Sequence, residues 1–249
     1  MSTGFDKHLR PGARRGLTFV EVLVMLAVIA LLIALILPLS RSGGRAAVRR
    51  AQCNNNLKQI ALALSNYRQE HKALPPAYTV DAEGRPLHSW RTLILPYLEM
   101  EPLYRKIDLS KPWDDPANAE ARETPLSVFR CPESAGPPNT TTYLAIVAPG
   151  GGLLPDRPRS LEDVTDSHAS TLLVIEAGEE GAVPWMAPTD ADEALVMGIG
   201  PKTQLHHNGG WNAVFVDGHA RFLSATMPAE ERRAMITIAG DDGEVVNEL

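Results

Sequence analysis

The residues best suited to chemistry stand near the C-terminal end of the chain. His207 precedes Gly209-Gly210, and after nine intervening residues comes Asp217. A turn at the glycines would bring His207 and Asp217 to one end of a hairpin, as a metal-binding or an acid/base pair. The alternative is a hydrogen-bonded pair that only fixes the loop. We expect that structural role, because the spacing fixes neither a nucleophile nor a third metal ligand.

Other possible metal ligands are scattered along the chain. His206 and His219 keep a metal site possible, whereas the two cysteines, Cys53 and Cys131, cannot form a four-ligand zinc site. They could form one disulfide bridge in an oxidising compartment. Calcium needs six to eight oxygen ligands. Acidic runs could supply them but match no known calcium loop, so we expect solvated loops and no cofactor: Asp114-Asp115, Asp190-Asp192-Glu193 and Asp241-Asp242-Glu244.

The sequence carries no recognised catalytic motif. It contains no G-x-S-x-G, no C-x-x-C and no H-E-x-x-H. The stretch from Gly198 to Thr203 resembles a phosphate loop only superficially, because Pro201 separates glycine from lysine and removes an amide donor. We therefore expect a function other than catalysis.

Charge and hydropathy divide the chain of 249 residues into four parts. Residues 1–16 carry a net charge of +3, residues 17–39 carry −1, residues 40–72 carry +6 and residues 73–249 carry −14. The acidic last part makes nucleic acid an unsuitable partner, because its field repels phosphate. The 23 residues of 17–39 hold a single charge, Glu21, and are long enough to cross the ~30 Å apolar core of a bilayer. We expect a retained membrane-spanning helix there, rather than a cleaved secretory signal.

Glu21 needs compensation inside an apolar segment. A carboxylate there costs up to about 2.5–3.5 kcal/mol, and no cation lies nearby on the same helix face. Cleavage between Gly16 and Leu17 would create an ammonium group four residues before Glu21, on that face. This amine could pair with Glu21 of its own chain or of a neighbouring chain.

The run from Gly16 to Glu21 resembles the leader of type IV prepilins and type II secretion pseudopilins. The resemblance implies that a prepilin peptidase cuts after Gly16 on the cytoplasmic side and methylates Leu17. It assigns Glu21 to subunit assembly and Pro38 to a helix kink. Leu17 and Phe19 exchange the usual order of phenylalanine and leucine. Positive charges balance across the span, so only this resemblance places the leader inside and the remainder outside.

Beyond the span, the sequence predicts a flexible break at Ser42-Gly43-Gly44, then a helix over residues 46–71 and a sheet-rich head. Leu57, Ile60, Ala61, Leu64 and Tyr67 form one apolar stripe that we expect to pack on the head, with Leu62 on the opposite side. Eighteen of the twenty prolines follow residue 72, which excludes long helices there. The predicted strands are 141–147, 171–176, 211–216 and 219–223. The last two form a hairpin (211–223) with a two-residue Asp217-Gly218 turn.

That hairpin predicts two different faces. Pairing across a two-residue turn places Trp211, Ala213, Phe215, Ala220 and Phe222 together on the core side. The wetter side then carries the alternate residues: Asn212, Val214, Val216, His219 and Arg221.

Four segments together resemble the DUF1559 family of bacterial proteins. They are the run from Arg49 to Ile60, Ser89-Trp90-Arg91 with Leu95-Pro96-Tyr97-Leu98, Phe129-Arg130-Cys131-Pro132, and a C-terminal H-x9-DG motif at His207, Asp217 and Gly218. The resemblance implies pseudopilin-like architecture and export, without an established reaction. Because cysteines recur in that family at both places, it also implies a Cys53–Cys131 disulfide.

These observations predict an α+β, pilin-like protein with four parts. They are a cytoplasmic leader (1–16), a transmembrane helix (17–39), an amphipathic stem helix (40–72) and a head with an antiparallel sheet (73–249). We expect a single-pass inner-membrane protein with its head outside the cytoplasm, acting as a subunit or minor component of a type II secretion or type IV pilus-like assembly. Its expected partners are inner-membrane lipid, prepilin peptidase and other pseudopilin-like subunits, without nucleic acid. Two alternatives remain: an anchored ligand- or partner-binding protein that forms no filament, and an exported enzyme that uses His207 and Asp217.

Overall fold

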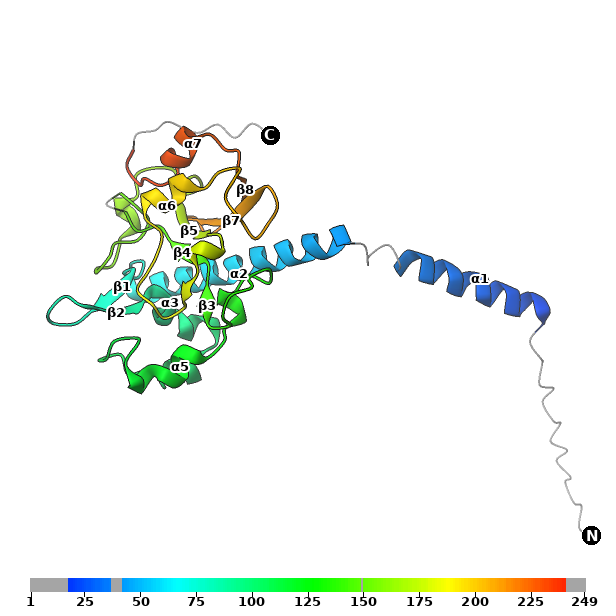
Figure 1. The fold of residues 1–249 in the computed structure, drawn as a ribbon, viewed down its shortest axis with the longest axis horizontal. Coiled ribbons are helices and arrows are strands. Elements are labelled where there is room, and N and C mark those ends of the chain that lie inside the picture. Colours follow the sequence, from blue (N-terminus) through cyan, green and yellow to red (C-terminus); the bar gives the residue numbers. More distant parts are fainter. Residues whose placement is uncertain (1–17, 37–41, 149, 241–249) are drawn as a thin grey trace, which may run out of the picture. The chain divides into compact units, whose positions relative to one another are not determined.

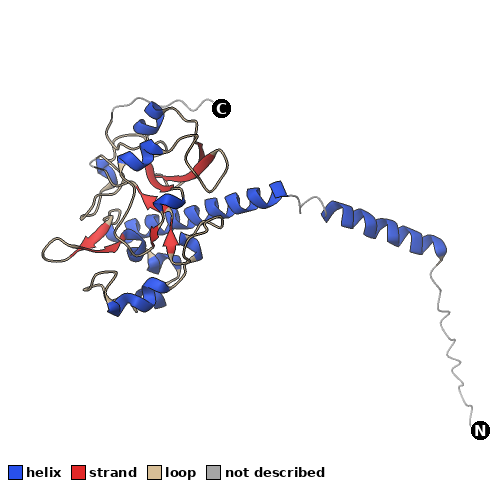
Figure 2. Cartoon of the chain, in the orientation of Figure 1, coloured by secondary structure: helices blue, strands red, loops and turns tan. Residues whose placement is uncertain are grey.

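The computed structural model describes residues 18–36, 42–148 and 150–240. The chain divides into two compact units, Met1–Arg45 and Ala46–Leu249. The helices are α1 (Phe19–Ile36), α2 (Ser42–His71), α3 (Trp90–Leu93), α4 (Glu101–Tyr104), α5 (Ala119–Glu123), α6 (Glu193–Gly198) and α7 (Ala229–Ala234). The strands are β1 (Tyr78–Val80), β2 (Pro86–Ser89), β3 (Thr140–Thr141), β4 (Tyr143–Ala145), β5 (Leu172–Glu176), β6 (Val183–Pro184), β7 (Gly210–Phe215) and β8 (Ala220–Ser224). Figure 1 labels most of them, and Figure 2 shows how much of the second unit is loop.

Helix α1 is apolar on all sides and begins with a capping box. The Thr18 backbone N–H donates to Glu21 Oε2 at 2.7 Å, and the Glu21 N–H donates to Thr18 Oγ1 at 3.3 Å. The Glu21 carboxylate therefore accepts hydrogen bonds from Thr18, a local partner that its sequence context did not lead us to expect. In the part of the chain that the structure describes, no helix reaches both the length and the hydropathy needed to cross a bilayer. Gly16, Leu17 and Pro38 lie outside the described residues.

Helix α2 starts earlier than predicted. It includes Gly43-Gly44, so the predicted break there is wrong. The two glycines lie in the first turn, whose N–H groups have no intrahelical partners, and glycine is tolerated at that position. The predicted stripe is confirmed: Leu57, Ile60, Ala61 and Leu64 are buried, and Leu62 is 62% exposed. Cys53 extends this stripe by one turn toward the N-terminus. The buried stripe lies in the apolar core shared with the sheet.

The main sheet is antiparallel and has four strands in the order β4-β5-β7-β8. All four predicted strand regions are therefore confirmed as strands. One face of the sheet packs in the same core as α2, and the other face packs with α6 and with residues that follow α7. Strand β7 is buried on both faces, so the prediction of one wetter face is wrong. Two shorter sheets, β1-β2 and β3-β6, complete the fold, which is α+β.

The predicted hairpin register is wrong by one residue. Val214 pairs with Ala220 and Ala213 with Arg221, because the turn uses three residues instead of two. Gly218 takes a φ of +92°, and its N–H donates to Phe215 O, which is typical of a three-residue turn with glycine in the left-handed region. A slip of one residue exchanges the faces of a strand, so Phe222 lies beside Asn212 instead of beside Ala213.

Candidate functional site

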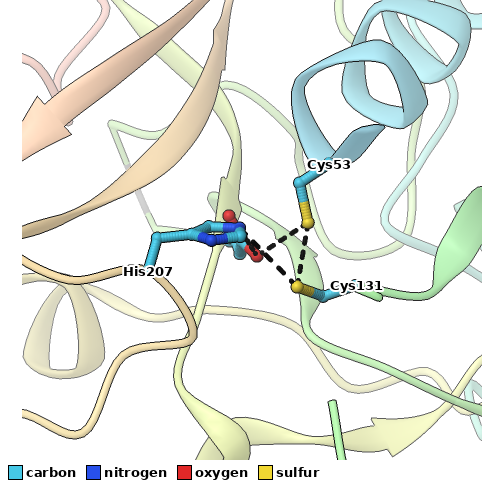
Figure 3. A group of neighbouring side chains, drawn as sticks. Cys53, Cys131 and His207 are labelled. Atoms are coloured by element: carbon cyan, nitrogen blue, oxygen red, sulfur yellow. Dashed lines mark hydrogen bonds and ion pairs between the residues drawn. The ribbon is translucent and has the colours of Figure 1, made fainter. Parts of the chain in front are cut away.

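Four buried side chains from separate parts of the second unit meet at the buried side of α2. They are Cys53 of α2, Cys131 of the loop after residue 129, Glu176 at the end of β5 and His207 before β7. One sulfur, nitrogen or oxygen atom from each lies within 4.8 Å of the other three. Figure 3 shows the side chains of Cys53, Cys131 and His207 pointing toward one another. A thiol pair, an imidazole and a carboxylate are together capable of binding a metal ion.

Individual distances define the centre of this group. The two Sγ atoms are 2.9 Å apart, and Glu176 Oε1 lies 3.1 Å from Cys53 Sγ. His207 Nε2 lies 3.2 Å from Glu176 Oε1 and 3.7 Å from Cys131 Sγ. Both cysteines are free. The predicted disulfide is therefore not formed here, because a covalent S–S bond is about 2.05 Å long.

Three polar residues lie side by side on neighbouring strands of the sheet, and Glu176 is the middle one. Tyr143 of β4 pairs with Glu176 of β5, and Asn212 of β7 is the next residue across the sheet. The Tyr143 hydroxyl donates to Cys53 Sγ at 3.0 Å, and Asn212 Nδ2 donates to Glu176 Oε2 at 2.6 Å. Asn56, one turn after Cys53 on α2, lies 3.5 Å from the Tyr143 hydroxyl. Asn212 therefore holds Glu176 through Oε2, and Oε1 faces the Cys53 sulfur.

Local packing explains why Cys131 and His207 reach this point. Phe129 is buried and stacks on Trp185, while Arg130 Nη2 donates to the carbonyls of Ser134 and Gly136, so the chain on both sides of Cys131 is held. Gly210 lies against β8, where a Cβ would collide with the backbone carbonyl oxygen of Leu223. This close approach requires glycine at the start of β7, three residues after His207.

Charges in this buried group are strongly coupled. Burial opposes ionisation of Glu176, but hydrogen bonds and the charge of His207 outweigh it and lower the pKa of the carboxyl to about 2. Burial likewise disfavours the charged imidazole, but hydrogen bonds to Cys131 and Glu176 raise the pKa of His207 to about 9. The hydrogen bond to Cys131, together with burial and the Glu176 charge, raises the pKa of Cys53. The same bond lowers the pKa of Cys131.

The predicted pairing of His207 with Asp217 is wrong, both as chemistry and as a structural pair. The six residues of β7 lie between them, so they stand at opposite ends of a strand, about 20 Å apart. Asp217 instead accepts from His219 Nδ1 at 2.6 Å in the turn. The neighbouring His206 does not belong to the four-residue group. Its Nε2 lies 3.6 Å from Glu179 Oε2.

Of the predicted acidic loops, residues 190–193 have defined structural roles. Asp190 is buried and accepts from Arg91 Nη1, whereas Asp192 caps α6 by accepting from the Leu195 N–H. Asp115 caps the short helical turn at residues 116–118, and residues 241–249 lie outside the described part. The expectation of solvated loops is therefore wrong for Asp190, whose side chain is 3% exposed.

The sequence analysis missed Glu176, Asn212 and Tyr143. One signal was present: Glu176 is a lone carboxylate that closes an otherwise apolar strand of five residues. A charge in that position is buried with the strand and therefore needs a partner. The partner, His207, was singled out but assigned to Asp217.

Residues 42–153 match a family model described as "Protein of unknown function (DUF1559)". No curated protein and no solved structure matches the chain. The matched segment contains Cys53 and Cys131. It does not extend to the leader-like run at Gly16, nor to Glu176 and the H-x9-DG motif that begins at His207.

Proposed function

Because residues 42–153 match the model of the DUF1559 family, we propose that this chain is a member of that family and a membrane-anchored, pilin-like structural protein. In this proposal, prepilin peptidase removes residues 1–16 on the cytoplasmic side and methylates Leu17. Residues 17–39 anchor the chain in the inner membrane, and the acidic head stands outside the cytoplasm. Side-by-side packing of the anchors then builds a secretion- or pilus-type assembly.

The observation that carries this proposal is the surface of α1. Its large apolar side chains from Phe19 to Ile33 are between 38% and 82% exposed, on every side of the helix. A helix that is apolar all round requires cover from protein or lipid. With Leu17 and the residues up to Leu39, the apolar run has 23 positions, or about 35 Å as a helix, which exceeds the ~30 Å apolar core. Lipid and neighbouring α1 helices supply the cover.

Glu21 supplies the contact between subunits. The capping box with Thr18 satisfies hydrogen bonds of the carboxylate, but no cation among the residues that the structure describes pairs with it. Removal of the leader would provide an ammonium group at Leu17, and the carboxylate of a neighbouring subunit would neutralise it. In lipid such a pair is favoured, because an unpaired charge is costly there.

Helix α2 has surface left for neighbours. Val48 is 65% exposed and Leu62 is 62% exposed, although the opposite side of the helix is buried in the core. The stem segment 40–72 carries +6, whereas the head carries −14. Basic stems and acidic heads of adjacent subunits therefore attract each other at low ionic strength.

The test uses the full chain produced together with a prepilin peptidase. Intact mass of the membrane-extracted protein should show a chain that begins at Leu17 with one added methyl group. Crosslinking in membranes should give oligomers of wild type and of Glu230→Ala, an exposed carboxylate of α7, but several-fold fewer of Glu21→Ala. Glu21→Ala should still be cleaved, which separates assembly from processing.

Two results would contradict the proposal. A mature chain that still begins at Met1 rules out the processing step. Equal crosslinking of Glu21→Ala and wild type removes the assigned role of Glu21 in assembly.

A further inference from the structure

We propose that Cys53, Cys131, Glu176 and His207 bind one zinc ion that fastens α2 to the sheet of the head. This inference goes beyond the proposed assembly and does not depend on the membrane anchor. The ligand atoms would be Cys53 Sγ, Cys131 Sγ, Glu176 Oε1 and His207 Nε2, whose mutual approach is described above.

The donor set selects the metal. Two thiolates and one imidazole favour zinc and exclude calcium and magnesium, which prefer oxygen ligands. All four residues are buried and each offers one atom, so the protein fills a tetrahedral shell without an open position. A closed site of this kind stabilises a fold and does not perform catalysis.

Tetrahedral geometry requires shifts of about 1 Å. With bond lengths of about 2.3 Å to sulfur and 2.0–2.2 Å to nitrogen and oxygen, ligand atoms stand roughly 3.3–3.8 Å apart. The His207–Glu176 distance of 3.2 Å and the His207–Cys131 distance of 3.7 Å are already close to these values, and all four ligand atoms lie within 4.8 Å of one another. The two sulfurs, which are 2.9 Å apart, must separate by about 0.9 Å.

A disulfide requires a shift of similar size in the opposite direction, from 2.9 Å to about 2.05 Å. It would account for the two cysteines alone. Zinc also accounts for a carboxylate and an imidazole buried beside them, at side-chain exposures of 2% and 4%. Buried anionic ligands require a cation at close range, and Zn²⁺ provides two positive charges at their centre.

The neighbouring hydrogen bonds match those around metal ligands. Asn212 holds Glu176 through Oε2, the oxygen that faces away from the sulfurs, and Tyr143 donates to Cys53 Sγ. Such contacts orient ligating atoms and stabilise a thiolate. A surface pocket of about 470 Å³, lined by Gln204, His207, Asn208 and Thr226, gives the ion a route to the imidazole.

Binding involves no redox step. Zinc takes both cysteines as thiolates and His207 as a neutral imidazole, so the thiol protons and any proton on the ring are released to solvent. The four Zn–ligand bonds form without breaking any covalent bond other than those to protons. The product ties three parts of the head to α2.

The experiment measures zinc in the full-length chain, purified without chelator from whichever cell fraction contains it. We expect one zinc per chain by elemental analysis, two thiols titrating after unfolding with chelator, and a lower thermal midpoint when zinc is removed. Cobalt substitution should give the visible absorption of a tetrahedral, thiolate-ligated ion.

Variants separate ligands from neighbours. Cys131→Ser and His207→Ala should reduce bound zinc from one to less than a tenth per chain, whereas the adjacent His206→Ala should retain it. Tyr143→Phe should weaken zinc binding roughly 10–100-fold without removing a ligand. If a ligand variant fails to fold, the zinc content and thiol count of the wild-type protein still decide the question.

Three outcomes would overturn the proposal. They are a purified wild-type chain without zinc, a chain lacking two hydrogens because its cysteines are joined, or loss of zinc in His206→Ala equal to that in His207→Ala.

Discussion

Arg91 and Asp190 form a fully buried ion pair, with Nη1 2.7 Å from Oδ1 and side-chain exposures of 0% and 3%. The remaining donors of Arg91 are also used: Nε donates to Trp185 O, and Nη2 to Ala187 O and Thr189 O. The pair lies 99 residues apart in sequence and joins α3 to the segment before α6.

Removing Arg91 should be strongly destabilising. Arg91→Met leaves the Asp190 carboxylate buried without its cation, and we expect a loss of about 3–5 kcal/mol in the free energy of unfolding. Urea denaturation of the full chain, followed by tryptophan fluorescence, measures it. The matched control is Arg105→Met, which breaks an exposed pair with Glu101 and should change stability by less than about 0.5 kcal/mol. Equal effects of the two changes would show that burial of Arg91 has no special cost.

Asn56 should contribute more to the free energy of unfolding than the adjacent Asn55. Its Nδ2 donates to the carbonyls of Ser127 and Arg130, both at 3.0 Å, and so ties α2 to the chain before Cys131. Asn56→Ala should cost about 1–3 kcal/mol, because it removes a buried donor and leaves carbonyls unpaired. Asn55→Ala, on the exposed side of α2, should be neutral or slightly stabilising, since alanine favours helix. Chemical denaturation compares them; a neutral Asn56→Ala would refute the link.

Replacing Gly218 should lower the stability of the fold because of its backbone conformation alone. Its φ of +92° disfavours any side chain, although a Cβ would meet no atom within 4 Å. Gly218→Ala should therefore lower stability by about 1–2 kcal/mol. Gly200→Ala is the control, because its surroundings are equally open and its φ is not in the left-handed region. Thermal unfolding of both variants checks the difference, and similar midpoints would argue against a left-handed turn.

His88 should make the fold sensitive to acid. Its side chain is fully buried, and burial lowers its pKa below the usual 6.5, an effect that the backbone of Lys111 and Asp108 offsets only in part. The unfolded chain therefore takes up this proton more readily, and stability falls as pH drops below about 6.5. His88→Gln should lose less stability than wild type between pH 7.5 and 5. Identical pH curves for His88→Gln and wild type would contradict the assignment.

Local patterns predicted helix α2 and the four strands of the main sheet, but not the short helices α3–α7 or the strands β1, β2 and β6. The stripe through Leu57 and Leu64 has a helical period, and the apolar runs at β5 and β7 have the length of strands, so each element carries its own signal. The register of the last hairpin did not follow, because Asp217-Gly218 is compatible with both two- and three-residue turns. Only the path of the chain around Gly218 decides which residues face α2.

The candidate site was only half predictable. Cys53 and Cys131 could be paired through a family resemblance, but Glu176 lies 45 residues beyond Cys131 and joins them only when β4 and β5 pair. His207 was assigned to Asp217 because the two stand close in sequence. A strand of six residues separates them, and the long-range contact with Glu176 replaces the expected one. Asp190 was misjudged for the same reason, since its partner Arg91 is remote in sequence.

Helix α2 runs without interruption from Ser42 to His71, and its buried stripe begins at Cys53. A mechanical pull at Ser42 that is directed along the helix axis would load the Cys53 and Asn56 contacts in shear. Contacts loaded together in shear resist force better than contacts opened one after another. A crosslink at Cys53 would halt the sliding of the helix at its first buried turn, so a chain with that crosslink should withstand the greater force.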